Sequence, residues 1–214
     1  MHALQSFDTL QLVALAAALG WASGLRLYAV LFIVGGLGYL HWIDLPAGLA
    51  VLAHPYVLGA SGFMCFVEFC ADKIPAVDSL WDVVHTVIRI PAGAALAASV
   101  FGDSSSAAMT AAAILGGTLA AGSHFVKAGS RAVINTSPEP FSNWAASFGE
   151  DVAVGAVLWL AFTYPLVALA VVALLTLVAI WLVPKLWRAV RRSAARVQGW
   201  FGQGRSDPAP RTER

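Results

Sequence analysis

The sequence predicts an all-α protein, a polytopic membrane bundle of about six transmembrane helices, from its composition and one long uncharged run. Hydrophobic residues make up 59% of the 214 residues and charged residues only 12%, about half the charged fraction of an average soluble domain. Residues 152–184 contain no Asp, Glu, Lys, Arg or His, and this run exceeds the roughly 20 apolar residues that one crossing needs. The composition excludes a soluble enzyme, a disordered chain and a nucleic-acid-binding module, so the lipid bilayer is the expected surrounding.

Six apolar stretches give the expected spans in order: 9–39, 56–71, 83–101, 107–128, 144–163 and 165–184. The first stretch is glycine-rich and long enough for a tilted or a broken span. Residues 44–55 are too short to cross and predict an interfacial turn and half-helix. The last long run is broken at Tyr164-Pro165, because proline cannot donate the interior helix bond.

Charge bias predicts the orientation of these spans. Residues 185–214 contain eight Lys or Arg and two acids, which predicts a cytoplasmic C-terminus, and six spans place both termini on that side. The loops near 72–82 and 129–143 then face the cytoplasm and contain Lys73 and Arg131, whereas the loops near 40–55, 102–106 and 164 contain no Lys or Arg.

The two inward loops resemble each other. An offset of 63 residues aligns the pattern Pro-x-x-x-Ser-x-Trp at 75–81 with the same pattern at 138–144, which suggests duplicated helix-loop-helix hairpins.

The sequence divides into three parts. Residues 1–184 form the expected transmembrane domain, in which the glycine-rich first span offers a surface for a homo-oligomer. Residues 185–201 have apolar and basic residues at helical spacing, which predicts a basic amphipathic cytoplasmic helix on anionic phospholipids. Residues 202–214 are expected to be disordered.

Polar residues of the transmembrane domain are concentrated in segments 68–89 and 127–151. A charge near the middle of a bilayer costs about 2.5–3.5 kcal/mol, so these residues need pairing or water, unless both segments are simply solvated loops. Asp78, Asp82, His85 and Arg89 fall on one face of a helix, as do Glu139, Asn143 and Glu150. Two such faces can line a polar cavity entered from the cytoplasm. The candidate substrate-binding residues are Glu68, Asp72, Asp78, Asp82, His85, Arg89, Lys127, Arg131, Asn135, Glu139, Asn143, Glu150 and Asp151.

Carboxylate and amide oxygens suit a divalent cation such as Mg²⁺ or Mn²⁺, whereas a histidine among acids suits proton relay. The candidate ligands of a divalent cation are Asp78, Asp82, His85, Glu139 and Glu150. Several of these polar residues also fit purely structural roles. Ser79-x-x-Asp82 fits a helix capping box, and His85 fits a hydrogen-bonded core histidine. Arg89 could pair with Asp82 or Glu150, and Arg26 with Glu68 or Glu150.

The strings GLRLYAVLF (24–32), EFCADKIPAVDSLWDVVHTVIRIPAGA (68–94) and INTSPEPFSNWAASFGEDV (134–152) resemble the bacterial membrane family catalogued as domain of unknown function 4126. The resemblance covers roughly residues 10–190 and implies a multi-span protein of the bacterial inner membrane, without a function to carry over.

The leading hypothesis is a non-enzymatic transporter or channel for a cation, divalent or proton-coupled, because acids outnumber Lys and Arg in the two polar segments. Three alternatives stay open. Arg89, Lys127 and Arg131 could bind an anion or a phospholipid headgroup. The acids and His85 could hold the metal of a membrane-embedded enzyme. The polar strings could instead lock helices together in a non-catalytic assembly protein.

Overall fold

The computed structural model describes residues 7–135 and 141–202, leaving out the side chains of residues 75–76 and 193–202, and within these ranges every regular element is helical. The elements are α1 (Thr9–Tyr39), η1 (Ala47–Ala53), α2 (Pro55–Ala71), α3 (Pro75–Val100), α4 (Ser106–Ile134), α5 (Phe141–Thr163) and α6 (Pro165–Gly202). Five of them are long and apolar enough to cross a membrane, or up to six when η1 and α2, bent by 69°, count as one span. The predicted all-α membrane bundle is therefore confirmed.

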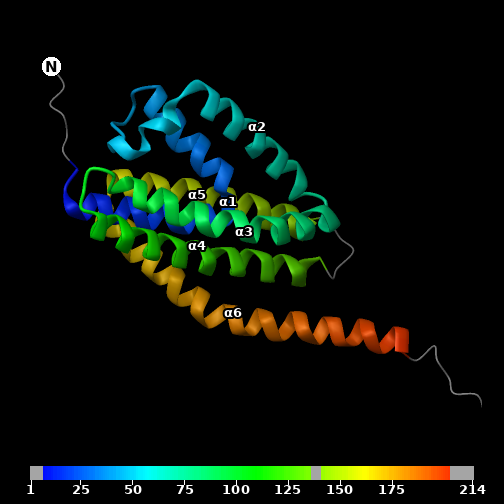
Figure 1. Cartoon of the computed structure of the whole chain (residues 1–214). Helices are drawn as coiled ribbons and strands as arrows, with labels where there is room; N and C mark the ends of the chain where they lie inside the picture. The colour runs from blue at the N-terminus through cyan, green and yellow to red at the C-terminus, as the bar shows by residue number, and fades with distance from the viewer. Residues whose placement is uncertain (1–6, 136–140, 203–214) are drawn as a thin grey trace, which may run out of the picture.

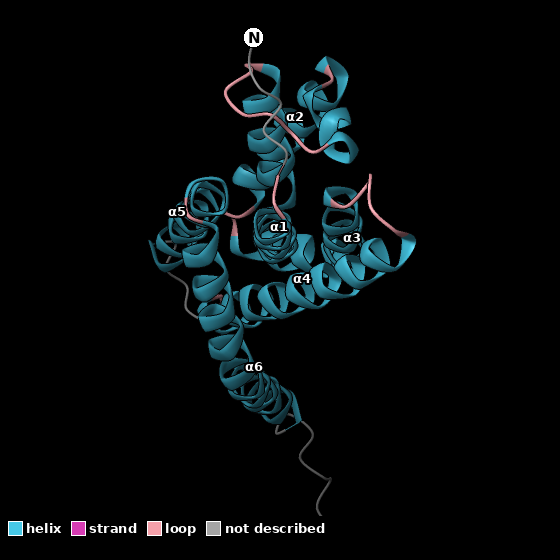
Figure 2. Ribbon diagram, turned by 90° about the vertical axis from the view of Figure 1, so that its left-hand side faces the viewer, coloured by secondary structure: helices cyan, strands magenta, loops and turns pink. Residues whose placement is uncertain are grey.

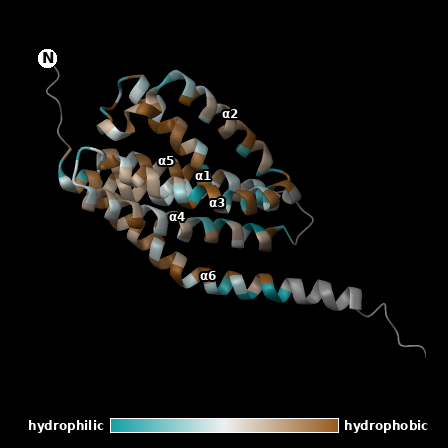
Figure 3. Ribbon diagram, viewed as in Figure 1, coloured by the Kyte–Doolittle hydropathy of each residue, from teal (hydrophilic) through white to brown (hydrophobic). Residues whose placement is uncertain are grey.

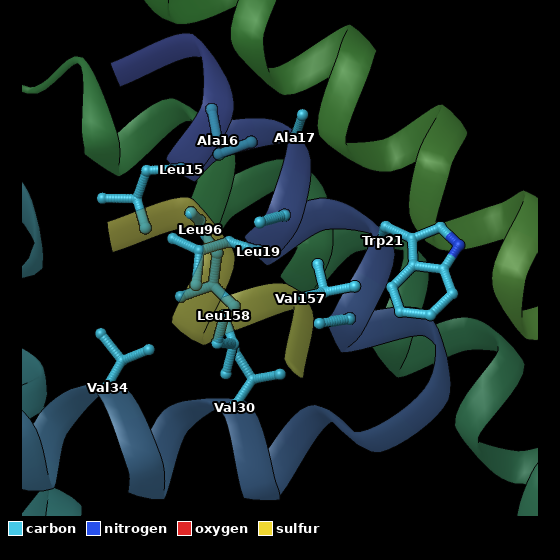
Figure 4. Close-up of a cluster of buried hydrophobic side chains, with 14 of the residues drawn as sticks. Leu15, Ala16, Ala17, Leu19, Trp21, Val30, Val34, Leu96, Val157 and Leu158 are labelled. Carbon is cyan, nitrogen blue, oxygen red and sulfur yellow. The ribbon is translucent and has the colours of Figure 1, made fainter. Parts of the chain in front are cut away.

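Helix α1 reverses direction at Arg26, whose backbone angles (φ −143°, ψ 73°) are not helical. In Figure 4, Leu15 and Val34 lie at one side of the close-up and Trp21 at the other, so the two arms of α1 run back along each other. The contacts agree. Val13 shares a cavity wall with Phe101 at the end of α3, while η1, which packs on the second arm, also meets the α3–α4 loop. The first helix is therefore broken at Arg26, although it was expected to be broken within one crossing.

This reversal separates the ends of the described chain. Helices α2 to α6 run alternately along the bundle, and Figure 1 shows the start of α1 and the C-terminal end of α6 at opposite ends of it. Both termini were expected on one face, because residues 9–39 were counted as one crossing. The arrangement differs from that expectation because α1 returns to the end from which it started.

Helix α1 is also the centre of the bundle, with α3, α4 and α5 around it (Figure 2). Its first arm lies against α4 at glycines: a Cβ at Gly20 would come within 2.5 Å of the Gly116 Cα. Apolar side chains of both arms pack with α3 and α5 into one core (Figure 4), including Leu19, Val30 and Leu158. The outer faces are apolar and exposed, as lipid contact requires.

Several helices extend beyond the apolar stretches that predicted them. Helix α3 begins at Pro75 with Ile74 as its N-cap, so Ser79 lies inside the helix and the capping-box alternative is wrong. Helix α6 continues through Pro184 without a break, and Figure 3 shows its apolar first part followed by a hydrophilic part. The predicted boundary at 184 is therefore a change of polarity within one helix. The tail predicted to be disordered lies outside the described residues from 203 onward.

Close packing of α1 on α4 predicts that Gly24 tolerates no side chain. A Cβ there would lie 2.1 Å from the Ser123 Oγ and 2.2 Å from the Ala120 carbonyl oxygen, whereas Gly36 in the same helix has nothing within 4 Å. We expect Gly24→Ala to lower the free energy of unfolding by about 1–3 kcal/mol through overpacking. Gly36→Ala is the matched control and should be neutral or stabilising by up to about 1 kcal/mol. Denaturant unfolding in detergent micelles compares them, and equal effects would contradict this packing.

Candidate functional site

Ten charged side chains meet inside the bundle and form what we call the ion-pair cluster. Within the described residues it contains six carboxylates and four cations: Glu68, Asp72, Asp78, Asp82, Glu150 and Asp151 with Arg26, Arg89, Lys127 and Arg131. They come from α1 to α5 and from the α2–α3 loop. The structure thus brings the two predicted polar segments together.

Arg26 enters the cluster from the point where α1 reverses. Its guanidinium group lies 2.7 Å from Asp72 and 3.1 Å from Asp151, with Glu150 at 3.5 Å. It also donates to the hydroxyl group of Ser147 at 2.7 Å. Of its two expected partners, Glu150 is correct and Glu68 is not, because Glu68 faces Arg89 instead. Since Arg26 is only 2% exposed, these carboxylates are what allows a charge at this depth.

Lys127 pairs with three of the six acids of the cluster. Its Nζ lies 3.0 Å from Asp72, 3.3 Å from Glu150 and 3.8 Å from Asp82. The same Nζ donates to the carbonyl oxygen of Leu25 at 3.2 Å, directly before the reversal of α1. A helix end leaves carbonyl groups that need donors, so Lys127 both neutralises acids and closes the first arm of α1.

Arg89 and Arg131 form the other ion pairs of the cluster. Arg89 pairs with Glu68 and, at 2.9 Å, with Asp82, so its expected pairing with Asp82 is confirmed. Arg131 lies 3.0 Å from Glu150, and its guanidinium group donates to the Asn143 side chain. The Asn143 amide in turn donates to the Asp72 carbonyl oxygen at 2.9 Å. The α2–α3 loop is therefore fastened to α4 and α5.

Two further predicted polar residues are held by hydrogen bonds. The amide nitrogen of Asn135 donates to Asp78 at 3.1 Å, and the neutral oxygen that Asn135 was expected to supply stays a prediction. His85 places Nδ1 2.8 Å from the Trp81 carbonyl oxygen and Nε2 3.2 Å from the Tyr28 hydroxyl group. Both ring nitrogens are thus engaged, which matches the hydrogen-bonded core histidine.

The predicted metal ligands do not converge. Within residues 7–135 and 141–202, no group of three His, Cys, Asp or Glu side chains is arranged to hold a metal ion. The acids face Arg and Lys instead, and Glu139 lies outside the described residues.

His124 belongs to the site and was missed by the sequence reasoning. Its Nε2 lies 2.7 Å from the Thr86 hydroxyl group and its Nδ1 3.4 Å from Arg89. His124, Lys127 and Arg131 follow helical spacing on one face of α4, and this pattern could have identified all three as a buried stripe.

Some carboxylate oxygens of the cluster lack a donor. Within the described chain, five of the six acids have a buried carboxylate oxygen that accepts no hydrogen bond: Glu68, Asp72, Asp78, Asp82 and Glu150. Six acids against four cations also leave two negative charges in excess when all are ionised. Such groups retain the capacity to bind a proton or another cation.

Asp72 lies in the α2–α3 loop and, like Glu150, pairs with three cations of the cluster. Its burial raises the pKa, but Lys127, Arg26 and Arg131 together outweigh burial and hold the pKa below its ordinary value of 3.8. Because the folded-state pKa is the lower one, the stabilisation from ionised Asp72 is complete above that value and is lost as the pH falls below it.

We expect Asp72→Asn to lower the free energy of unfolding by about 3–5 kcal/mol at neutral pH, because buried cations lose a charged partner. The difference from the unsubstituted protein should shrink as the pH falls below about 4, where the Asp72 carboxyl group itself takes up a proton. Denaturant unfolding in detergent across this range measures both effects. Asp103→Asn, in the exposed α3–α4 loop, is the control and should stay within about 0.5 kcal/mol. A difference that does not change with pH would refute the role of the ionised group.

Comparison with known proteins identifies a family for this chain but no individual related protein. Searches of the curated proteins and of the solved structures found no match for the chain. The sequence profile of one family matches residues 13–185, a range that contains the described part of the ion-pair cluster and nearly all of the predicted transmembrane domain. The resemblance drawn from the sequence is thereby confirmed at the level of the family. The chain belongs to the family described as Domain of unknown function (DUF4126).

Proposed function

We propose that this membrane protein is a small transporter or channel for a cation, and that the ion is a proton or is exchanged for protons. The observation that carries the proposal is the excess of buried acids, five of them with an oxygen that accepts no hydrogen bond from the described chain. The acids are linked through shared cations, as Asp72 and Asp82 are through Lys127. A proton can move along such a linked series, whereas a divalent metal needs several oxygens converging on one point.

We infer that the α2–α3 loop and the basic end of α6 face the cytoplasm of a bacterial plasma membrane. The exposed residues Lys185, Arg188, Arg191 and Arg192 on α6 then meet anionic phospholipid headgroups. Because α1 reverses, Thr9 belongs to the outer face together with the α3–α4 loop, and that face carries no Lys or Arg in loops 40–55 and 102–106. A homo-oligomer remains a prediction.

A second candidate, a non-catalytic assembly protein, is favoured by how the cations are used. Arg26 joins α1 to α5 and to the α2–α3 loop, and Arg131 joins α4 to the same two elements. Ion pairs of this kind can serve only as locks between helices. The headgroup-binding alternative is less well supported, because Arg89, Lys127 and Arg131 already face carboxylates.

Flux through reconstituted vesicles separates transport from assembly. We expect Asp82→Asn to reduce proton flux, followed with an internal pH-sensitive dye, by at least about tenfold, because an amide cannot take up a proton. Asp82→Glu should retain flux, and Asp103→Asn should behave as the unsubstituted protein. Equal flux from the Asp82→Asn protein, with lowered stability, would support the assembly candidate and reject transport.

Labelling of single cysteines tests the orientation. On a chain with Cys65→Ser and Cys70→Ser, which has no other thiol, cysteine replaces Thr9, Ser104 or Arg192 in turn. We expect a membrane-impermeant maleimide added to intact cells to label the first two positions, and the third only after permeabilisation. Labelling of positions 9 and 192 from the same side would show that α1 crosses the membrane.

A further inference from the structure

Beside the ion-pair cluster lies an aromatic cavity whose wall contains one acid of that cluster, Asp151. It has a volume of about 400 Å³ and lies between the second arm of α1, α2 and α5. Phe32, Phe66 and Phe69 line it, together with Cys65 and the acid Asp151. This volume is within the range of small-molecule sites, roughly 300–1,000 Å³.

Among the described residues, Asp151 is the only charged one in the wall of this cavity, and it is 35% exposed. One of its oxygens, Oδ1, lies 3.1 Å from Arg26, and the described chain provides no other ion pair to this carboxylate. A second cavity of about 250 Å³, toward α6, contains both Lys127 and Glu150 in its wall. Because those two groups are only 3.3 Å apart, their charges cancel. Of these two cavities, the one at Asp151 presents a carboxylate without a cation in its own wall.

The aromatic wall is suited to a positive charge. The rings of Phe32, Phe66 and Phe69 are partly exposed, and aromatic faces attract ammonium and related cations within about 6 Å. An ammonium group already lies on one of these rings, since the Lys73 Nζ is 3.0 Å from the centroid of Phe69. Apolar walls disfavour a hydrated metal ion, which keeps its water shell.

We propose that this cavity binds a lipophilic organic cation, with its charge at Asp151 and its apolar body against the three phenylalanine rings. This inference rests on the proposed function in one respect, since it names the class of cation that the transporter exchanges for protons. A cation at Asp151 competes with Arg26 for the carboxylate, and Arg26 in turn holds Asp72. Occupation of the cavity therefore changes the partners of the ion-pair cluster.

Protection of Cys65 from alkylation tests the binding site without requiring transport. The chain has two cysteines, so Cys70→Ser leaves only the thiol in the cavity wall. Purified protein is treated with N-ethylmaleimide in the presence of tetraphenylphosphonium or of tetraphenylborate, two ions of the same shape and opposite charge. We expect the phosphonium ion to slow alkylation about tenfold at saturation and the borate ion to have no effect. In the Cys65→Ser protein, Cys70 should show no protection.

Substitutions at Asp151 test the charge. Asp151→Asn should raise the concentration of phosphonium needed for half-protection by about tenfold, Asp151→Glu should change it little, and Asp103→Asn should not change it.

Two outcomes overturn the proposal. One is equal protection by both ions, which is the result expected if the cavity binds an acyl chain. The other is no protection by the phosphonium ion. Proton flux without protection rejects this site and leaves the proposed function standing. Protection without any flux supports the site and rejects transport.

Discussion

The pairing of Arg26 with Asp72 is the interaction on which the arrangement of this protein depends. Arg26 occupies the one non-helical position of α1, and its side chain reaches the α2–α3 loop at 2.7 Å. A guanidinium group at this depth is stable only with carboxylates around it, and breaking a buried pair typically costs about 3–5 kcal/mol. The pair therefore fixes three things together: the point at which α1 turns back, the position of the loop, and the centre of the ion-pair cluster.

Lys127 and Ser123 explain how the chain can turn inside an apolar bundle. A break in a helix exposes carbonyl groups that lipid cannot satisfy. Ser123 Oγ donates to the Trp21 carbonyl oxygen at 2.7 Å, and Lys127 donates to that of Leu25. Both donors come from α4, which approaches closely because the facing residues are glycines. The small residues of α4 thus allow it to approach α1 closely, and its polar residues donate hydrogen bonds to the carbonyl groups at the break in α1.

Much of the fold could be predicted from hydropathy, and part of the site from the clustering of charge. The bounds 9–39 for the first helix and the break at Tyr164 are as predicted, since apolar runs and proline act locally. The convergence of segments 68–89 and 127–151 could also be predicted, because buried charges require partners. The reversal at Arg26 could not, since nothing in the apolar pattern of residues 9–39 distinguishes one crossing from two arms. Individual partners depend on that reversal, which explains why Asp72 was not predicted as the partner of Arg26.

The reversal of α1 is compatible with the charge argument for the proposed orientation. Residues 1–8 contain no Lys or Arg, so moving this segment to the outer face leaves the basic residues on the inner side. The reversal also gives the two faces different structures. The end of the bundle at which α1 starts is closed by η1 packed on α1 and on the α3–α4 loop, while the opposite end contains the acids and their cations. In the orientation proposed above, a transported ion meets the protonatable groups first from the cytoplasmic side, and its route outward passes the apolar core between the two arms of α1. Such a barrier fits alternating access better than an open pore.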